Sequence, residues 1–132
     1  MKNKLTILVL VFVLALTLAA CAPAKPVLNV TATDKGYDSP SYTVPAGATV
    51  TLNFKNAGGL THEFAILKLG QHVIPPFGEK DEDKIYWELD GVAADTTMSG
   101  TFTAPTEPGE YDVLCGIPGH IEMGMITKLI VK

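Results

Sequence analysis

The feature that most constrains the fold is a series of short β-rich segments separated by turn residues. Segment 48–54 alternates polar and apolar side chains, so that Val50, Leu52 and Phe54 share one face of a half-buried strand. No segment has the pattern of a long amphipathic helix. Further strands are predicted over residues 27–33, 62–67, 97–103, 110–115 and 126–131. The series predicts an all-β Greek-key sandwich or barrel of about seven to eight strands.

Residues 70–95 fit this series least well. They contain Pro75-Pro76, the charged run 79–84 and the only tryptophan, Trp87. We therefore expect an insertion here, with one short strand or one helical turn near residues 85–89. The charged run is either a solvated surface or a patch that attracts a cationic partner.

The first twenty residues have the organisation of a secretory signal. Lys2 and Lys4 precede the apolar run 5–18, which is shorter than the about 20 apolar residues that a membrane-spanning helix needs. Cleavage before Cys21 is therefore favoured over an uncleaved membrane anchor. The ending Leu18-Ala19-Ala20-Cys21 resembles the lipobox of bacterial lipoproteins, and the resemblance implies that Cys21 carries lipid.

Three parts of the chain are predicted: a signal peptide over residues 1–20, a lipid-anchored tether over 21–26 and one domain over 27–132. The lipid would hold the domain on the extracytoplasmic side of a membrane, in the periplasm or at the cell surface. Without Lys2 and Lys4, eight basic residues stand against fourteen acidic ones, a formal charge of −6. Nucleic acid is not an expected partner, because binding it needs a cationic surface.

Cysteine usage points to metal binding. The chain has two cysteines, so a lipid on Cys21 leaves Cys115 without a disulfide partner. In an oxidising compartment such a thiol is expected to be buried or bound to metal. His120 and Met125 follow Cys115 within eleven residues, after the sharp turn 116–119. Thiolate, imidazole and thioether together are ligands that suit copper.

A second histidine would complete this set of ligands. His62 follows Gly58-Gly59 at the start of a predicted strand, where a sandwich can bring it beside the Cys115 loop. The sequence alone does not prove that adjacency. Two histidines, a cysteine and a distant axial methionine describe an electron-transfer copper site. We predict one copper ion held by His62, Cys115, His120 and Met125.

These residues and their spacing resemble the cupredoxin family, over residues 27–132. In this family the first ligand histidine lies mid-chain, and the other ligands follow a strand ending Tyr-x-x-x-Cys, as Tyr111 and Cys115 do here. The four residues between Cys115 and His120 resemble the ligand loop of azurin and auracyanin. The resemblance implies a blue-copper protein that shuttles single electrons between membrane-associated redox proteins, for example a cytochrome or a respiratory or photosynthetic complex.

Other functions are weighed on the same residues. The predicted ligands leave no open coordination position for a substrate, so an enzyme is not expected. A copper carrier or sensor is the alternative. The two-copper centre of cytochrome oxidase subunit II would need a second cysteine in the ligand loop, and position 111 holds Tyr111. A carboxylate ligand from Glu63 or Glu122 is a further alternative to Met125.

The resemblance also bears on the axial ligand. Met125, five residues after His120, is at the usual family position, whereas the shorter spacing of azurin would reach Gly124. Met123 therefore remains a second candidate. Glu63 stands where many cupredoxins carry an asparagine that bonds across the ligand loops, and its charge implies a lower reduction potential.

Several further residues are assigned from their neighbours in the sequence. His72 is expected at the surface, and Met98 is expected to pack against the sandwich. An apolar collar around the exposed edge of His120 is expected from Ile117, Pro118, Ile121 and Met123. The charged run 79–84 either remains solvated or steers a basic redox protein toward the domain.

Overall fold

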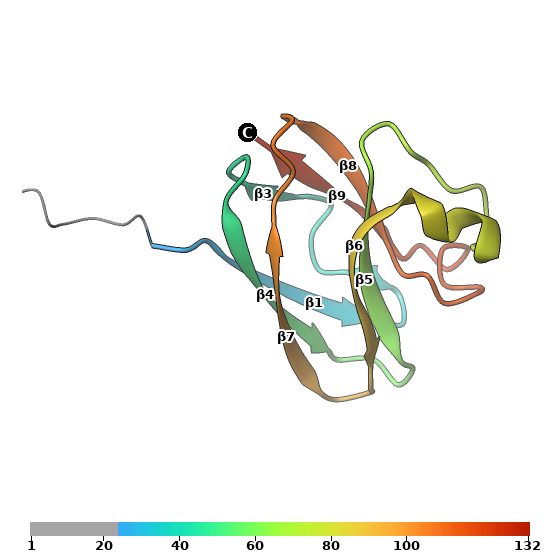
Figure 1. Ribbon diagram of the computed structural model, residues 1–132. Helices are drawn as coiled ribbons and strands as arrows, with labels where there is room; N and C mark the ends of the chain where they lie inside the picture. Colours follow the sequence, from blue (N-terminus) through green and yellow to red (C-terminus); the bar gives the residue numbers. More distant parts are fainter. Residues whose placement is uncertain (1–23) are drawn as a thin grey trace, which may run out of the picture.

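A computed structural model describes residues 24–132 as two β-sheets packed face to face (Figure 1). The predicted signal peptide and Cys21 lie outside the described residues. One sheet has the order β2 (Gly36–Tyr37), β1 (Val27–Thr33), β4 (Thr49–Asn56), β7 (Thr97–Thr103). The other has the order β3 (Tyr42–Val44), β9 (Ile126–Val131), β8 (Gly109–Leu114), β5 (His62–Leu67), β6 (Ile85–Val92). Within the described part of the chain, we find no helix with the length and apolar character of a membrane span.

The all-β sandwich predicted from the sequence is confirmed. Strands β1, β5, β7 and β9 begin and end at the predicted residues, and β8 is shifted by one residue. The described residues contain more strands than predicted, because the structure adds β2 and β3, which are only two and three residues long. Elements this short carry no alternating pattern, so the sequence does not reveal them.

The core between the sheets follows from the alternation along β4. Val50, Leu52 and Phe54 are each 0% exposed, as their shared face predicts. Phe54 meets Phe64 of the opposite sheet edge to face, with ring centroids 6.0 Å apart. The same core cluster includes Cys115 and Met125. The predicted ligands are therefore part of the packed interior.

Of the two elements considered for residues 85–89, the strand is present as part of β6 (Ile85–Val92), and a 3-10 helix lies before this range. A 3-10 helix, η1 (Glu79–Lys84), leads directly into β6, which pairs antiparallel with β5. The charged run is not wholly solvated, because Asp81 is 1% exposed and accepts hydrogen bonds from Lys84 Nζ at 2.8 Å and the Gly78 N–H at 3.2 Å. Met98, expected to pack against the sandwich, is 41% exposed on the edge strand β7.

A buried carboxylate ties the segment between β5 and η1 to the second sheet. Asp112 on β8 is 6% exposed, accepts a hydrogen bond from Lys128 Nζ and lies 2.7 Å from Nδ1 of the exposed His72. Burial acts to raise the pKa of Asp112, but Lys128 and His72 outweigh it and hold that pKa below its usual value. A carboxyl with a lowered folded-state pKa stabilises the fold above its unfolded-state pKa and loses this effect as the pH falls.

We expect Asp112→Asn to lower the free energy of unfolding by about 2 kcal/mol at neutral pH, because the buried carboxylate loses its ion pair with Lys128 and its charged contact to the His72 ring. The deficit should shrink as the pH falls from about 5 and vanish below the folded-state pKa. Urea titrations of both proteins across this range measure it. Asp95→Asn removes an equal charge at an exposed turn residue and should change stability by less than about 0.5 kcal/mol. A deficit independent of pH would contradict the assignment.

Candidate metal centre

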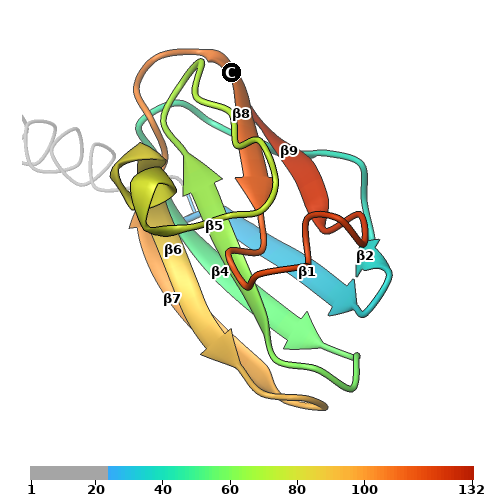
Figure 2. The same cartoon turned by 90° about the vertical axis from the view of Figure 1, so that its right-hand side faces the viewer.

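Two strands and one loop supply the predicted ligands. His62 is the first residue of β5, Cys115 follows the last residue of β8, and Met125 precedes β9. Strands β5 and β8 are paired neighbours, which brings the two sequence-distant ends together. Figure 2 shows the connection from β8 to β9 lying beside the β1–β2 turn at one end of the sandwich.

The loop after Cys115 is closed by backbone hydrogen bonds. The N–H of Met125 donates to the carbonyl of His120 at 3.0 Å, and the N–H of Cys115 donates to the carbonyl of Met125 at 3.2 Å. Gly119 and Gly124 adopt positive φ angles of 91° and 98°, which residues other than glycine rarely adopt. These turns bring His120 and Met125 back toward Cys115, as the sequence predicted.

The donor atoms of three predicted ligands converge. One donor atom each from His62, Cys115 and His120 lies within 4.8 Å of the others. His120 Nδ1 is 3.3 Å from His62 Nδ1 and 3.2 Å from Cys115 Sγ. His62, Cys115 and Met125 are 0% exposed, and His120 is 6% exposed. The structure thus supplies the adjacency of His62 that the sequence alone did not prove.

Burial shapes the proton affinities at this centre. Burial raises the pKa of the Cys115 thiol, although hydrogen bonds from the N–H groups of Ile117 and Glu63 act in the opposite direction. Burial also lowers the pKa of His120, helped by the neighbouring His62. A neutral imidazole is ready to bind a metal, whereas the thiol must lose its proton when a metal binds.

Asn56, which the sequence analysis missed, holds the loop that precedes His62. Its Nδ2 donates to the carbonyls of Leu60 at 2.7 Å and Val92 at 2.9 Å, and its Oδ1 accepts from the Gly58 N–H at 2.8 Å. A signal for this residue exists, because position 56 continues the inward alternation of β4 and yet is polar. A polar side chain on a buried face needs partners.

Asp34, in the turn between β1 and β2, was also missed. Its carboxylate accepts hydrogen bonds from the N–H groups of Gly59 at 3.0 Å and Leu60 at 3.1 Å, and lies 3.0 Å from Nε2 of His62. The two amide donors, followed by His62, hold the pKa of Asp34 below its usual value. No local pattern marks this residue, because its partners lie more than twenty positions away.

Glu63 bridges β5 and the loop after Cys115. Its carboxylate accepts a hydrogen bond from the Gly116 N–H, and its carbonyl accepts one from the Tyr37 hydroxyl at 2.8 Å. Burial raises the pKa of Glu63, and the nearby carboxylates of Asp90 and Glu88 raise it further. Glu63 therefore makes the bond across the ligand loops that the family resemblance assigned to an asparagine.

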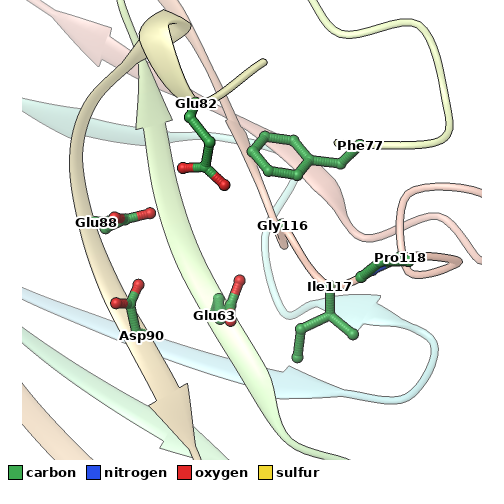
Figure 3. A pocket seen from close by; sticks show the side chains of 8 residues that line it. All are labelled: Glu63, Phe77, Glu82, Glu88, Asp90, Gly116, Ile117 and Pro118. Atoms are coloured by element: carbon green, nitrogen blue, oxygen red, sulfur yellow. The ribbon is translucent and has the colours of Figure 1, made fainter. Parts of the chain in front are cut away.

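A pocket of about 310 Å³ lies on the outer side of this bridge (Figure 3). The carboxylates of Glu63, Glu82, Glu88 and Asp90 face it from three elements, β5, η1 and β6. Phe77 and residues 116–118 complete its wall. Part of this acidic lining is visible in the sequence, because Glu88 and Asp90 are two positions apart on one strand.

The four residues expected to form a collar around His120 differ in exposure. Met123 is 46% exposed and Pro118 is exposed, as predicted. Ile121, however, is 9% exposed and packs into a second core cluster with Leu67, Phe77 and Leu114. Ile121 therefore anchors the ligand loop from beneath.

Comparisons with known proteins place this fold and site in a family. A family model described as a cupredoxin-like domain matches residues 5–86. A rusticyanin of Acidithiobacillus ferrooxidans is 34% identical over 125 residues, which cover 86% of this chain and 73% of the relative. This chain belongs to the cupredoxin family. Auracyanin-A of Chloroflexus aurantiacus is also similar, with 30% identity over 73% of this chain and 67% of the relative.

Solved structures of cupredoxins agree with this assignment. A reduced auracyanin from Roseiflexus castenholzii has a TM-score of 0.69 and 28% identity, and the match covers 83% of this chain and 99% of that chain. Auracyanin A, described as a "blue" copper protein, has a TM-score of 0.63 and 28% identity, with 80% and 99% covered. The chain spans 60% of the length of the rusticyanin of Acidithiobacillus ferridurans.

The donor set of this cupredoxin fits one copper ion, the cofactor predicted from the sequence. Two imidazoles, one thiol and a thioether nearby match the ligands that copper accepts in both oxidation states. The family model ends at residue 86, before the Cys115 loop. The assignment of individual ligands therefore depends on the geometry of the site.

The two candidate axial methionines differ in burial, and this difference makes them separable by mutation. Met125 is 0% exposed and Met123 is 46% exposed. We expect Met125→Leu to raise the reduction potential, because loss of the axial donor destabilises the more highly charged cupric ion more than the cuprous ion. Each tenfold change in the ratio of cupric to cuprous affinity corresponds to about 59 mV. Met123→Leu should leave the potential unchanged. Protein-film voltammetry of both variants measures this, and the reverse result would make Met123 the ligand.

Proposed function

We propose that this cupredoxin is a mononuclear blue-copper electron-transfer protein, with His62, Cys115, His120 and Met125 as its ligands. The observation that carries the proposal is the convergence of two imidazoles and a thiol, within 4.8 Å, in the interior of a rigid sandwich. Copper bound there would alternate between its cuprous and cupric states and so supply one-electron transfer. The four ligands leave no open position for a substrate, which favours electron transfer over catalysis.

The residues of this chain hold the ligands in place and exclude water. His62 is fixed by the first bonds of β5 and by the loop that Asn56 holds, and Cys115 is fixed by the end of β8. The backbone hydrogen bond from the Met125 N–H to the His120 carbonyl holds the main chains of these two residues together. A site whose ligands move little between oxidation states transfers electrons with little reorganisation.

His120 is the proposed exit for the electron. It is 6% exposed, whereas the other three proposed ligands are 0% exposed, so its ring is the part of the site closest to solvent. The exposed Met123 and Pro118 belong to the same loop. A partner that contacts this loop would approach the ligands more closely than one bound elsewhere.

The partners and location that we propose follow from the sequence. Lipid at Cys21, with a tether over residues 21–26, would anchor the domain to the extracytoplasmic face of a membrane. The donor and acceptor would then be redox proteins at the same membrane, such as a cytochrome. Mass spectrometry of the protein purified from membranes would reveal the acyl groups or their absence.

The visible and electron-spin spectra of the full chain, purified in detergent and loaded with cupric ion, test the main proposal. Intense absorption near about 600 nm that one electron per protein bleaches reversibly is expected of a copper–thiolate bond. Bound copper with weak colour would contradict the proposal and favour a copper carrier or sensor. A protein that binds no copper would overturn both functions.

A further inference from the structure

The two ring nitrogens of His62 have different surroundings. Nδ1 is 3.3 Å from His120 Nδ1 and faces the other donor atoms, whereas Nε2 lies 3.0 Å from Oδ1 of Asp34. The ring is 0% exposed, so neither nitrogen depends on solvent for a partner. A metal binds the unprotonated nitrogen of a neutral imidazole, and a carboxylate at the other nitrogen retains the proton there.

The carboxylate of Asp34 is held against the loop that precedes His62. Oδ2 accepts from the Gly59 N–H at 3.0 Å, and Oδ1 accepts from the Leu60 N–H at 3.1 Å. These bonds orient the carboxylate before any metal binds. Although 43% of the Asp34 side chain is exposed, its position relative to the ring is therefore defined by three contacts.

Gly58 leaves the space that this contact needs. A Cβ added at this position would collide with Oδ1 of Asp34 and would lie 2.8 Å from Nε2 of His62. Gly58 lies in the loop between β4 and β5, whereas Asp34 lies in the turn between β1 and β2. The close approach of carboxylate and ring is thus built into two separate parts of the chain.

We propose that Asp34 is a positioning residue of the metal centre: through Nε2 of His62 it directs Nδ1 toward the metal, strengthens that nitrogen as a donor and lowers the reduction potential. The proposal deepens the proposed function and rests on it. An anionic partner for the ring favours the ion of higher charge, so it stabilises cupric copper more than cuprous copper. Asp34 acts only through His62 and is not itself a ligand.

The reduction potential of Asp34→Asn tests the effect of the carboxylate on the metal. The variant keeps an oxygen that accepts from Nε2 but removes the charge, so we expect the preference for cupric over cuprous ion to fall about tenfold, which raises the potential by about 59 mV. Asp95→Asn removes the same charge from an exposed turn without a contact to His62, and its potential should equal that of the wild type. An unchanged potential in blue, folded Asp34→Asn would overturn the proposal.

The ring nitrogens of His62 in the metal-free protein provide a second readout. In nitrogen-15 spectra at about pH 8, where imidazoles are neutral, we expect the wild type to carry its proton on Nε2. Asp34→Ser retains an acceptor for the loop amides but lacks the carboxylate, and should populate both tautomers. It also replaces Asp34→Asn in voltammetry if that variant does not fold. A proton on Nδ1 of His62 in the wild type would overturn the inference. Absence of the blue colour in copper-loaded wild type would instead overturn the proposed function alone.

Discussion

Cys115→Ser is expected to abolish the intense absorption near about 600 nm, because this band requires a thiolate bound to copper. Cys115 is 0% exposed, and among the described residues no other cysteine exists to replace it. A serine hydroxyl is a harder and far more basic donor, so copper affinity should also fall, by about 100-fold or more. Visible spectra at equal copper loading and a competition titration with a chelator measure the two effects.

The control for this variant is the fold without metal. Serine is nearly isosteric with cysteine, and its hydroxyl can accept the hydrogen bonds that the Ile117 and Glu63 N–H groups donate to Cys115. We therefore expect metal-free Cys115→Ser to lose no more than about 1 to 3 kcal/mol of stability and to retain its β-sheet spectrum. A variant that is folded and still blue would exclude Cys115 as the ligand responsible for the colour.

Asn56→Ala is expected to lower the free energy of unfolding by about 3 kcal/mol. The substitution removes three hydrogen bonds of a 0% exposed side chain and leaves the Gly58 N–H and the Leu60 and Val92 carbonyls without their partner. An unpaired buried polar group costs about 1–3 kcal/mol. Because the loop leads directly into His62, copper affinity should fall as well. Urea denaturation of the metal-free protein measures the stability term separately.

Asn53→Ala is the matched control on the same strand. Asn53 is only partly buried and bonds to the side chains of Asn29 at 3.0 Å and Ser99 at 2.8 Å. Its loss should cost less than about 1 kcal/mol and leave copper affinity unchanged, since water can replace these partners. Equal costs for Asn53→Ala and Asn56→Ala would show that the loop before His62 does not depend on the Asn56 bonds.

The strands were predictable because side-chain alternation is a local property. A strand with one face packed against the other sheet is apolar at about every second position, so Val50, Leu52 and Phe54 are enough to predict β4. The same rule places Asn56 inside. Strands β2 and β3 escape it, because two or three residues cannot show a period. Near residues 85–89 the sequence left a strand and a helical turn open, and the structure has the strand β6 there, whereas the helix η1 precedes it at Glu79–Lys84.

The candidate site likewise has a part that local spacing predicts and a part that depends on the tertiary structure. The spacing of Cys115, His120 and Met125 lies within one loop, so the sequence by itself determined that a thiol, an imidazole and a thioether would lie close together. Only the tertiary structure decided that His62 joins them, because the pairing of β5 with β8 brings together residues far apart in the chain. The ligand roles themselves remain predictions for the variants above to test.

The contacts between separate segments around the site are decided by the tertiary structure. Asp34 reaches His62 across 28 positions of the chain, and Glu63 meets Glu82, Glu88 and Asp90 only because η1 and β6 pack beside β5. Alternation and spacing record which face a residue occupies and which neighbours it has along the chain. Contacts between separate turns depend on how the sheets twist and stack, and no local pattern carries that information.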